Sequence, residues 1–414
     1  MSDTAATVMR ARTAKRILGV SSSKMRSDAL LAMSDVIFAR RAQIIASNAC
    51  DLADAKKLGL SEALLDRLTL TQDRIDDMCG SIRKIAAFDE PLGTVLEKKK
   101  LENGLRLEKV TVPIGVIAVI FEARPNVAAD SAALCIKSGN AVILRGGKEA
   151  LNSNRALTEA MRDAVESVGL SRDVISFIED TSHESANELM RMKGIIDLLI
   201  PRGSARLIDA VVKNSTVPVI ETGAGTCHIY IDEDADLAMA AKIVYNAKTS
   251  RPSVCNACEC ILVNRKIAPR FLPQAEALLA EKSVELRADR EALGLLKNAV
   301  AAAEDDWGRE YNDYILACRV VGDVNEAIEH IERYGTGHSE AIVTKNEKTA
   351  EYFLANVDAA AVYVNASTRF TDGGVFGLGA EIGISTQKLH ARGPLGLREL
   401  TSYKYLIRGD GQIR

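Results

Sequence analysis

The sequence predicts an α/β protein with two parallel sheets, each covered by helices on both faces. Three observations predict this class. Residues 1 to about 90 carry helical patterns only, and from residue 113 to about 230 short apolar strands alternate with helices. A second alternating run begins at Ile261. Because strands that are apolar on both faces need a cover on each, they are typical of parallel sheets between layers of helices.

Helix caps and turn residues predict the elements that precede the first alternating run. The long helices expected there have hydroxyl caps: Ser22 or Ser23 for residues 24–46, and Thr71 for residues 72–88. An Asn-Gly pair at 103–104, between alternating apolar residues, predicts a β-hairpin at 99–111. Its strands are highly charged, so the hairpin needs a partner surface for stability.

The alternating runs define the remaining elements. Strands of the first run are expected at Gly115–Ile120, Ala141–Leu144, Val174–Ile178, Ile195–Ile200, Val217–Ile220 and Cys227–Ile231. Strands of the second run are expected at Ile261–Val263, Ile315–Val321, Ala341–Val343 and Ala360–Val364, with helices near 269–282, 324–334 and 346–356. The glycine-rich segment 373–380 predicts a loop near a site.

Composition excludes several classes of function. The chain of 414 residues is 47% hydrophobic and 26% charged, and its net charge of −3 mixes both signs. Such a balance predicts no nucleic-acid or membrane partner. The longest apolar run, Val112–Phe121, has about half of the roughly 20 residues that a membrane span needs. Eight cysteines without a secretory signal indicate a reducing compartment, and we expect the cytoplasm.

The stretch 246–260 holds the residue on which the predicted chemistry depends, Cys255. Turn-forming residues between 249 and 253 end a helix and place this cysteine on a loop before a buried strand. A thiol held there can be aimed, and the nearby Arg251 favours the thiolate. These residues alone favour the simpler interpretation that Cys255 is a small packing residue, as most cysteines are.

Two turns suit a phosphorylated cofactor, although no G-x-G-x-x-G fingerprint follows the first strand. The segment 144–149, Leu-Arg-Gly-Gly-Lys-Glu, follows a strand end and carries two cations. The segment 201–204, Pro-Arg-Gly-Ser, opens a helix whose first N–H groups can bind a phosphate.

The chain resembles the aldehyde dehydrogenase superfamily and, within it, the γ-glutamyl phosphate reductase family, over nearly its whole length. The most specific match is the stretch 321–342, and four shorter segments also match: Phe121–Val127, Lys137–Asn140, Glu221–Gly225 and Arg251–Asn256. The resemblance implies an aldehyde-dehydrogenase-like fold. A Rossmann-type cofactor domain would comprise 1–98, 112–228 and 365–397, a catalytic domain 229–364, and an oligomerisation flap 99–111 and 398–414.

The resemblance also implies roles for single residues. Cys255 matches the nucleophile, and Asn126 matches the amide of the oxyanion hole, a role that it could combine with capping the helix before Val127. In the cofactor site, Arg145 matches the lysine that touches the adenosine ribose, and Gly203 and Ser204 match the pair near the pyrophosphate. Glu310 matches the glutamate at the nicotinamide ribose, although it could also be a solvated carboxylate. Lys148 stands where relatives that prefer NAD often carry a glutamate, so we expect NADPH. Glu221 matches the superfamily's general base for hydrolysis, but this reaction should exclude water, so Glu221 is expected to line the site at most. Arginines or His338 are candidates for binding the substrate's carboxylate or phosphate, and the segment at His338 could equally be a structural turn.

The implied reaction is the NADPH-dependent reduction of L-glutamyl 5-phosphate to L-glutamate 5-semialdehyde, in proline biosynthesis, through a thioacyl group on Cys255. The implied partners are this substrate, further copies of the chain in a dimer or larger oligomer, and glutamate 5-kinase. Two alternatives remain. One is a hydrolytic or CoA-dependent enzyme of the superfamily. The other is a metal-binding or redox protein using Cys255, Cys258 and Cys260, although the last two are expected to lie in a core and no metal is expected.

Overall fold

The computed structural model describes residues 2–414, which form two compact units. Unit 1 comprises residues 2–222, 377–383 and 389–414, and unit 2 comprises 223–376 and 384–388. These divisions differ from the predicted ones at 228/229 and 364/365. The first difference arises because Cys227–Ile231, expected at the end of the first run, pairs entirely with strands of the second sheet.

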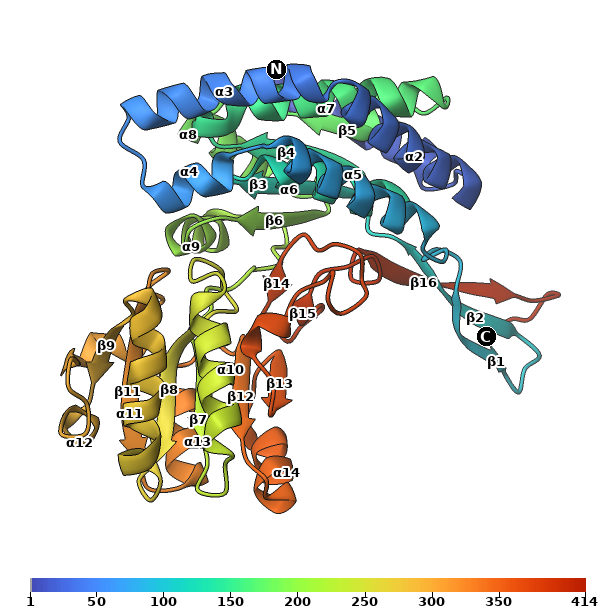
Figure 1. Cartoon of the computed structure of the whole chain (residues 1–414). Coiled ribbons are helices and arrows are strands. Elements are labelled where there is room, and N and C mark those ends of the chain that lie inside the picture. The colour runs from blue at the N-terminus through green and yellow to red at the C-terminus, as the bar shows by residue number, and fades with distance from the viewer. Residues whose placement is uncertain (1) are drawn as a thin grey trace. The chain divides into compact units, whose positions relative to one another are not determined.

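Unit 1 contains a parallel four-stranded sheet with the order β5-β4-β3-β6. The chain enters at β3, moves outward to β4 and β5, and returns to the other side of β3 with β6, with a helix between successive strands (Figure 1). The bounds are β3 (Val116–Phe121), α6 (Pro125–Lys137), β4 (Ala141–Gly146), α7 (Leu151–Ser167), β5 (Ile175–Phe177), α8 (His183–Arg191), β6 (Leu198–Arg202) and α9 (Ala205–Asn214). The predicted strand Val217–Ile220 is wrong, because only an isolated bridge joins Leu199 to Val219.

Helices precede this sheet in the chain, as the sequence predicts: α1 (Asp3–Leu18), α2 (Ser23–Ala39), α3 (Arg41–Lys57), α4 (Glu62–Leu68) and α5 (Gln72–Ala87). The Ser22 hydroxyl caps α2 by accepting from the Met25 N–H, and Thr71 caps α5 in the same way. The single helix expected over 24–46 is in fact two helices, which meet at Arg40.

The sheet of unit 1 is buried on both faces. Residues that alternate along β3 contribute to different clusters, Ile117 and Val119 to one and Val116 and Ala118 to the other. The first cluster includes α2, α5, α6 and α7, and the second includes α1, α8 and α9. All six residues of β3 are buried, as expected of a central parallel strand.

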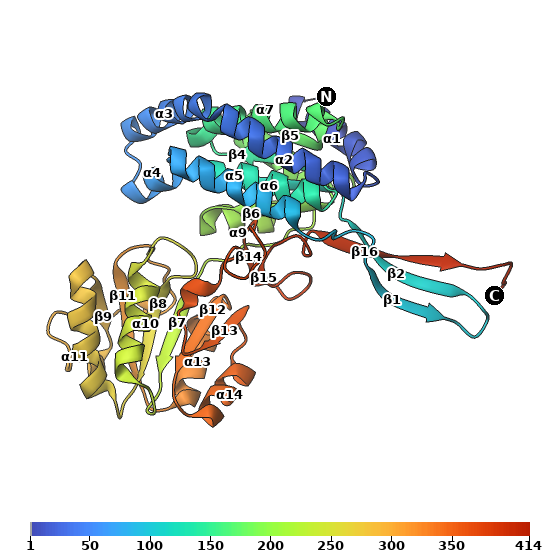
Figure 2. The same cartoon turned by 45° about the vertical axis from the view of Figure 1, so that its right-hand side comes forward.

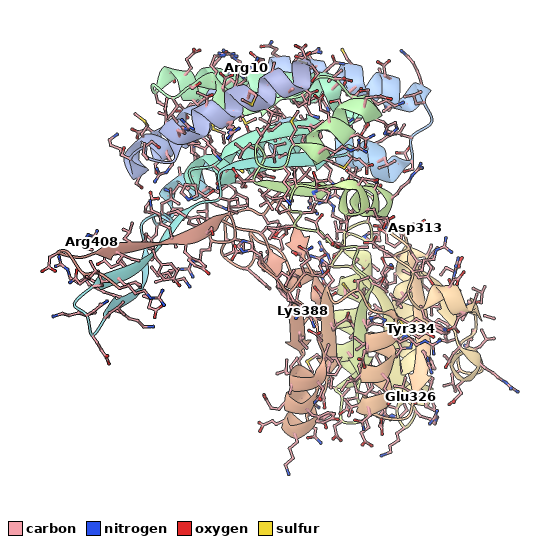
Figure 3. The ribbon with its side chains drawn as sticks, turned by 180° about the vertical axis from the view of Figure 1, so that it is seen from behind. Arg10, Asp313, Glu326, Tyr334, Lys388 and Arg408 are labelled. Carbon is pink, nitrogen blue, oxygen red and sulfur yellow. The ribbon has the colours of Figure 1, made fainter. Side chains whose placement is uncertain are left out.

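The predicted hairpin is confirmed, and a third strand joins it. β1 (Val95–Lys100) and β2 (Arg106–Pro113) pair antiparallel, and the chain end returns as β16 (Thr401–Arg408) on the other side of β2. Figure 2 shows the three strands side by side. Arg408, labelled in Figure 3, forms an ion pair with Glu108 at 2.6 Å. We call β1, β2 and β16 the flap.

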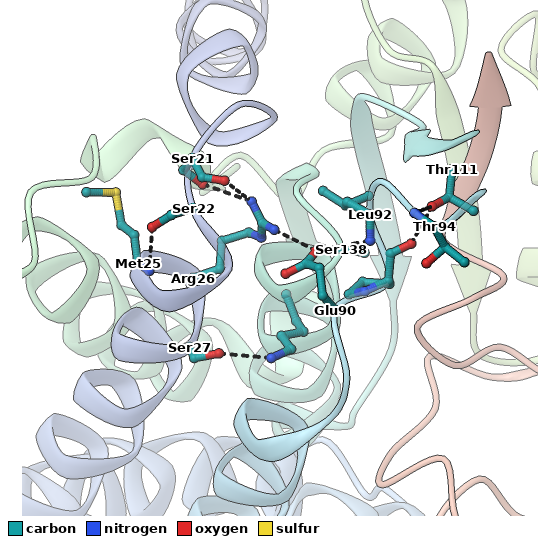
Figure 4. A network of polar contacts seen from close by, with 12 residues as sticks. Ser21, Ser22, Met25, Arg26, Ser27, Glu90, Leu92, Thr94, Thr111 and Ser138 are labelled. Carbon is teal, nitrogen blue, oxygen red and sulfur yellow. Dashed lines mark hydrogen bonds and ion pairs between the residues drawn. The ribbon is translucent and has the colours of Figure 1, made fainter. Parts of the chain in front are cut away.

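A polar network joins α2 to the start of the flap (Figure 4). The buried Arg26 contacts Glu90 at 2.6 Å, and the Glu90 carboxylate also accepts the N–H of Leu92. The Thr111 hydroxyl of β2 donates to the carbonyl of Pro91 at 2.7 Å. The chain between α5 and β1 is therefore fixed at several points.

Unit 2 contains a parallel seven-stranded sheet with the order β10-β9-β11-β8-β7-β12-β13. Helices α10, α11 and α12 pack on one face, and α13 and α14 on the other. The bounds are β7 (Cys227–Ile231), α10 (Leu237–Thr249), β8 (Cys258–Asn264), α11 (Ala268–Leu279), β9 (Glu285–Ala288), α12 (Arg290–Leu293), β10 (Val300–Ala301), β11 (Ile315–Val321), α13 (Val324–Tyr334), β12 (Ser339–Val343), α14 (Glu347–Asn356) and β13 (Ala361–Val364). Short strands β14 (Ile384–Ser385) and β15 (Gly393–Pro394) follow.

In the part of the chain that the structure describes, no helix combines the length and apolar character that crossing a membrane requires.

Candidate active site

In unit 1, the predicted cofactor residues gather at the carboxyl edge of the sheet. The last residues of three strands are register partners there, because Phe121 of β3 pairs with Gly146 of β4 and Arg202 of β6. Lys148 and Ser204 follow directly from these ends. The chain changes direction between β3 and β6, and open parallel sheets bind ligands at the carboxyl ends beside such a point.

Gly203 and Ser204 form the entry to α9. The Ser204 hydroxyl caps the helix by accepting from the Leu207 N–H. The Glu122 carboxylate accepts the Ser204 N–H at 2.7 Å, and a Cβ on Gly203 would lie only 2.5 Å from that carboxylate. The helix N-terminus thus holds an anionic group at close range, as its free N–H groups and dipole favour.

Arg145 and Lys148 are presented differently. The Arg145 guanidinium is buried and donates to the carbonyls of Thr181 and Ser182 at 2.9 and 2.7 Å. Burial lowers the pKa of Arg145. Lys148 is exposed, at the start of a 3₁₀ turn. Lys148 can therefore reach an incoming ligand, whereas Arg145 anchors the segment that leads into α8.

Asn126 is the second residue of α6, and Arg124 is the N-cap residue. The expectation that Asn126 could cap this helix is therefore wrong. Its exposed side-chain amide donates to Asp130 at 3.2 Å, one turn further on. Burial raises the pKa of Asp130 to about 6, while the hydrogen bond from Asn126 opposes that rise.

In unit 2, Cys255 lies on the loop between α10 and β8, at the amino end of the sheet. In unit 1, by contrast, the cofactor residues lie at the carboxyl ends of the strands. Cys255 is partly exposed, whereas Cys227, Cys258 and Cys260 are buried. Burial raises the pKa of each of these three thiols. Of these four cysteines, Cys255 alone combines a loop position with access to solvent.

Buried residues of neighbouring segments hold the Cys255 loop in place. The buried Lys248 at the end of α10 and Glu259 in β8 form an ion pair at 2.6 Å. The thiol of Cys227 donates to the Cys255 carbonyl at 3.2 Å. Gly225 passes so closely that a Cβ there would lie 1.4 Å from the Cys255 carbonyl oxygen. The position of the loop therefore depends on a residue without a side chain at 225.

Glu310 and His338 lie in the same unit. One carboxylate oxygen of the half-buried Glu310 accepts the Gly225 N–H at 3.0 Å, which brings Glu310 near the Cys255 loop. His338 is fully buried, and its Nδ1 lies 2.8 Å from the Ser339 hydroxyl and 3.8 Å from the Cys227 sulfur. His338 thus lies in the core beside Cys227, whose thiol contacts the Cys255 loop. Glu221, in unit 1, is half-buried.

The predicted core position of Cys258 and Cys260 is confirmed, and Cys260 lies beside two histidines. Ligand atoms of His228, Cys260 and His330 are all within 4.8 Å of one another and buried. However, Arg319 donates to His330 Nδ1 at 3.0 Å, which leaves the ring proton on Nε2, 3.8 Å from the Cys260 sulfur. A metal would need a lone pair on that nitrogen, so the cluster fits a polar core better than a ligand set.

The chain belongs to the aldehyde dehydrogenase family, whose model matches residues 1–301. It is similar to the gamma-glutamyl phosphate reductase of Clostridium beijerinckii, with 54% identity over 98% of both chains. The corresponding enzyme of Streptococcus suis is 55% identical over 97% of both. The crystal structure of gamma-glutamyl phosphate reductase from Thermotoga maritima has a TM-score of 0.96 at 45% identity and covers 100% of both chains.

More distant structures share the fold alone. An acetylating aldehyde dehydrogenase from Geobacillus thermoglucosidasius has a TM-score of 0.72 at 18% identity, covering 100% of this chain and 97% of that one. The predicted aldehyde-dehydrogenase-like fold and family are confirmed.

Three residues in or against the Cys255 loop have no assigned role in the sequence prediction: Gly225, Asn256, and Arg369, which donates to the Asn256 side chain. The first two lie inside matched motifs, but their contacts come from segments about 30 to 110 residues away in the chain and leave no local pattern. Arg369 follows β13, and nothing in its local sequence distinguishes it from other surface arginines.

Proposed function

We propose that the chain catalyses the NADPH-dependent reduction of L-glutamyl 5-phosphate to L-glutamate 5-semialdehyde, with release of phosphate, in proline biosynthesis. The observation that carries this proposal is a partly exposed Cys255 on an anchored loop, in a chain with full-length similarity to gamma-glutamyl phosphate reductases. An acyl phosphate needs a nucleophile but no strong acid, because phosphate is a good leaving group.

In the proposed mechanism the Cys255 sulfur bonds to the acyl carbon, and the bond from that carbon to the phosphate oxygen breaks. Phosphate leaves with the electron pair, and a thioacyl group remains on Cys255. The oxyanion formed in this step is stabilised by the Asn126 amide and the Cys255 backbone N–H. Each such donor contributes roughly 3–4 kcal/mol in comparable sites.

The residues of unit 1 fit a phosphorylated dinucleotide. The N-terminus of α9 already holds a carboxylate through Ser204, and Gly203 allows a close approach. The exposed Lys148 supplies the charge that favours a 2′-phosphate, and Arg145 is the proposed neighbour of the adenosine ribose. Glu310, a residue of unit 2, is the proposed neighbour of the nicotinamide ribose. When bound, NADPH supplies the hydride that converts the thioester carbon to the aldehyde level.

A spectrophotometric assay in the reverse direction tests this function. NADPH formation from L-glutamate 5-semialdehyde and NADP+ should require inorganic phosphate and should not respond to CoA. NADPH formation that proceeds without phosphate would indicate a hydrolytic enzyme, and dependence on CoA would indicate an acyl-CoA-forming enzyme of the same family. Either result would contradict the proposal.

The flap is the proposed oligomerisation surface, and the cytoplasm is the proposed compartment. Both outer strands of the flap, β1 and β16, are edges, and they expose Leu96, Tyr403, Tyr405 and Ile407. Exposed apolar edges are covered in stable proteins, here by a second copy of the chain. Light scattering should show a dimer or larger oligomer that deletion of 398–414 disrupts. Association with glutamate 5-kinase would be tested by the same light-scattering measurement on a mixture of the two proteins.

A further inference from the structure

Arg369 is built into the Cys255 loop from a distant part of the chain. It lies in the 3₁₀ turn Thr368–Phe370, and its Nη1 donates to the side-chain oxygen of Asn256, the residue after Cys255. Its Nε donates to the Ser250 hydroxyl at 3.0 Å. The backbone of the same turn is also fixed, because the Thr368 hydroxyl donates to the Asn256 carbonyl at 2.7 Å.

Asn256 completes this arrangement. Its buried side-chain amide donates to the carbonyl of Thr371 at 2.8 Å and to that of Arg369 at 3.3 Å. One asparagine thus orients both the backbone and the guanidinium of Arg369. A long, flexible side chain is thereby held in one direction beside the loop that carries the nucleophile.

The charge of Arg369 is not neutralised by this arrangement. Both of its hydrogen-bond acceptors, Ser250 and Asn256, are neutral. Within residues 2–414, no carboxylate forms a direct ion pair with Arg369; Asp372 acts on it only through its charge. Burial lowers the pKa of Arg369, and Arg251 lowers it further, whereas Cys255 and Asp372 oppose this. Two guanidinium groups therefore lie within electrostatic range of each other beside Cys255.

We infer that Arg369 binds the phosphoryl group of the acyl phosphate, and inorganic phosphate in the reverse reaction, with Arg251 as a second cation; this rests on the function proposed above. The departing phosphate takes the electron pair of the broken carbon–oxygen bond and needs a cation rather than a proton. A guanidinium fork matches phosphate oxygens and stays charged at every working pH. Paired cations at the loop would also distinguish an acyl phosphate from an uncharged acyl donor.

The test measures the KM of each substrate in the reverse reaction for wild-type protein and for Arg369→Gln, Arg369→Lys and Arg251→Gln. Arg369→Gln should raise the KM for phosphate about 10- to 100-fold, as expected for a lost charge-assisted bond, and change those for NADP+ and semialdehyde less than about threefold. Arg369→Lys should recover part of the loss. Arg251→Gln should raise the phosphate KM by a smaller factor. The matched control is Arg265→Gln, which removes an exposed arginine of unit 2 paired with Glu291.

A second readout does not depend on turnover. Phosphate should slow the alkylation of Cys255 by iodoacetamide in the wild-type protein and in Arg265→Gln, and should fail to do so in Arg369→Gln at the same concentrations. If the wild-type reaction requires phosphate but Arg369→Gln leaves the KM for phosphate unchanged, the inference is overturned while the proposed function stands. An equal rise of all three KM values would also overturn the inference, since that indicates a distorted loop. A wild-type enzyme that ignores phosphate would overturn the inference and the proposed function together.

Discussion

Lys248 Nζ and Glu259 Oε2 lie 2.6 Å apart, with both side chains almost completely excluded from solvent, on either side of the loop that carries Cys255. The pair fastens the end of α10 to the start of β8, and the loop spans the gap between them. Burial raises the pKa of Glu259 to about 7, and Lys248 opposes this rise. The support of the nucleophile is thus an ion pair that is costly to break.

Replacing Lys248 with Met should strongly destabilise the protein at pH 8. Without Lys248, which lowers the pKa of Glu259, the buried carboxyl must either stay ionised without a partner or take up a proton at pH 8, and breaking such a pair costs about 3–5 kcal/mol. Urea denaturation measures the loss, which should shrink at pH 5, where Glu259 is protonated. The double variant Lys248→Met/Glu259→Leu should recover most of the stability at pH 8. If Lys248→Met alone is as stable as the wild type at pH 8, the ion pair does not stabilise the loop's supports.

Gly225→Ala should displace the Cys255 loop. The added Cβ would fall 1.4 Å from the Cys255 carbonyl oxygen, so one of the two backbone segments must move. A displacement of the nucleophile by about 1 Å costs about 100-fold in rate. The control Gly308→Ala meets nothing closer than 3.5 Å and should keep its activity. Equal kcat values for the two variants would show that the close approach is unimportant.

Lys148→Glu should reverse the preference between cofactors. A carboxylate repels a 2′-phosphate, so kcat/KM with NADPH should fall about 10- to 100-fold while that with NADH changes little. Initial rates with both cofactors measure the ratio. Lys56→Glu, an exposed substitution in α3, serves as the charge-matched control. An unchanged ratio in Lys148→Glu would remove this residue from the cofactor site.

Asp130→Asn should stabilise the protein above pH 6. The pKa of Asp130 is about 6 in the folded chain against a usual 3.8, because burial favours the protonated form. That preference stabilises the fold below pH 4 and is lost as pH rises through 6, so ionised Asp130 costs about 2–3 kcal/mol at pH 8. The gain in the urea midpoint should therefore appear at pH 8 and vanish at pH 4. A gain of equal size at pH 8 and pH 4 would contradict a raised pKa of Asp130.

Local patterns predicted the elements whose boundaries depend on local causes. β11 and α13 occupy the predicted residues, because each is a periodic run ended by turn residues or a cap. The predictions failed where contacts with distant parts of the chain determine where an element ends or whether it forms. Nothing in the sequence near Arg40 marks the break between α2 and α3, and Val217–Ile220 has strand composition but forms only a bridge.

The site divides in the same way. The loop position of Cys255 follows from turn-forming neighbours, and the family resemblance supplied its role. The residues that hold the loop could not be predicted, because Arg369 reaches Asn256 across 113 positions of the chain. The direction of an arginine depends on such contacts, and periodicity carries no information about them.

The central claim is a glutamyl group carried by Cys255, and mass spectrometry of the modified protein tests it most directly. Wild-type protein would be incubated with L-glutamate 5-semialdehyde and NADP+ without phosphate, quenched in acid and digested. We expect a glutamyl group on Cys255 that disappears when phosphate is added, and none on Cys255→Ser. Formation of NADPH with Cys255 unmodified, or with the group on another residue, would contradict the account.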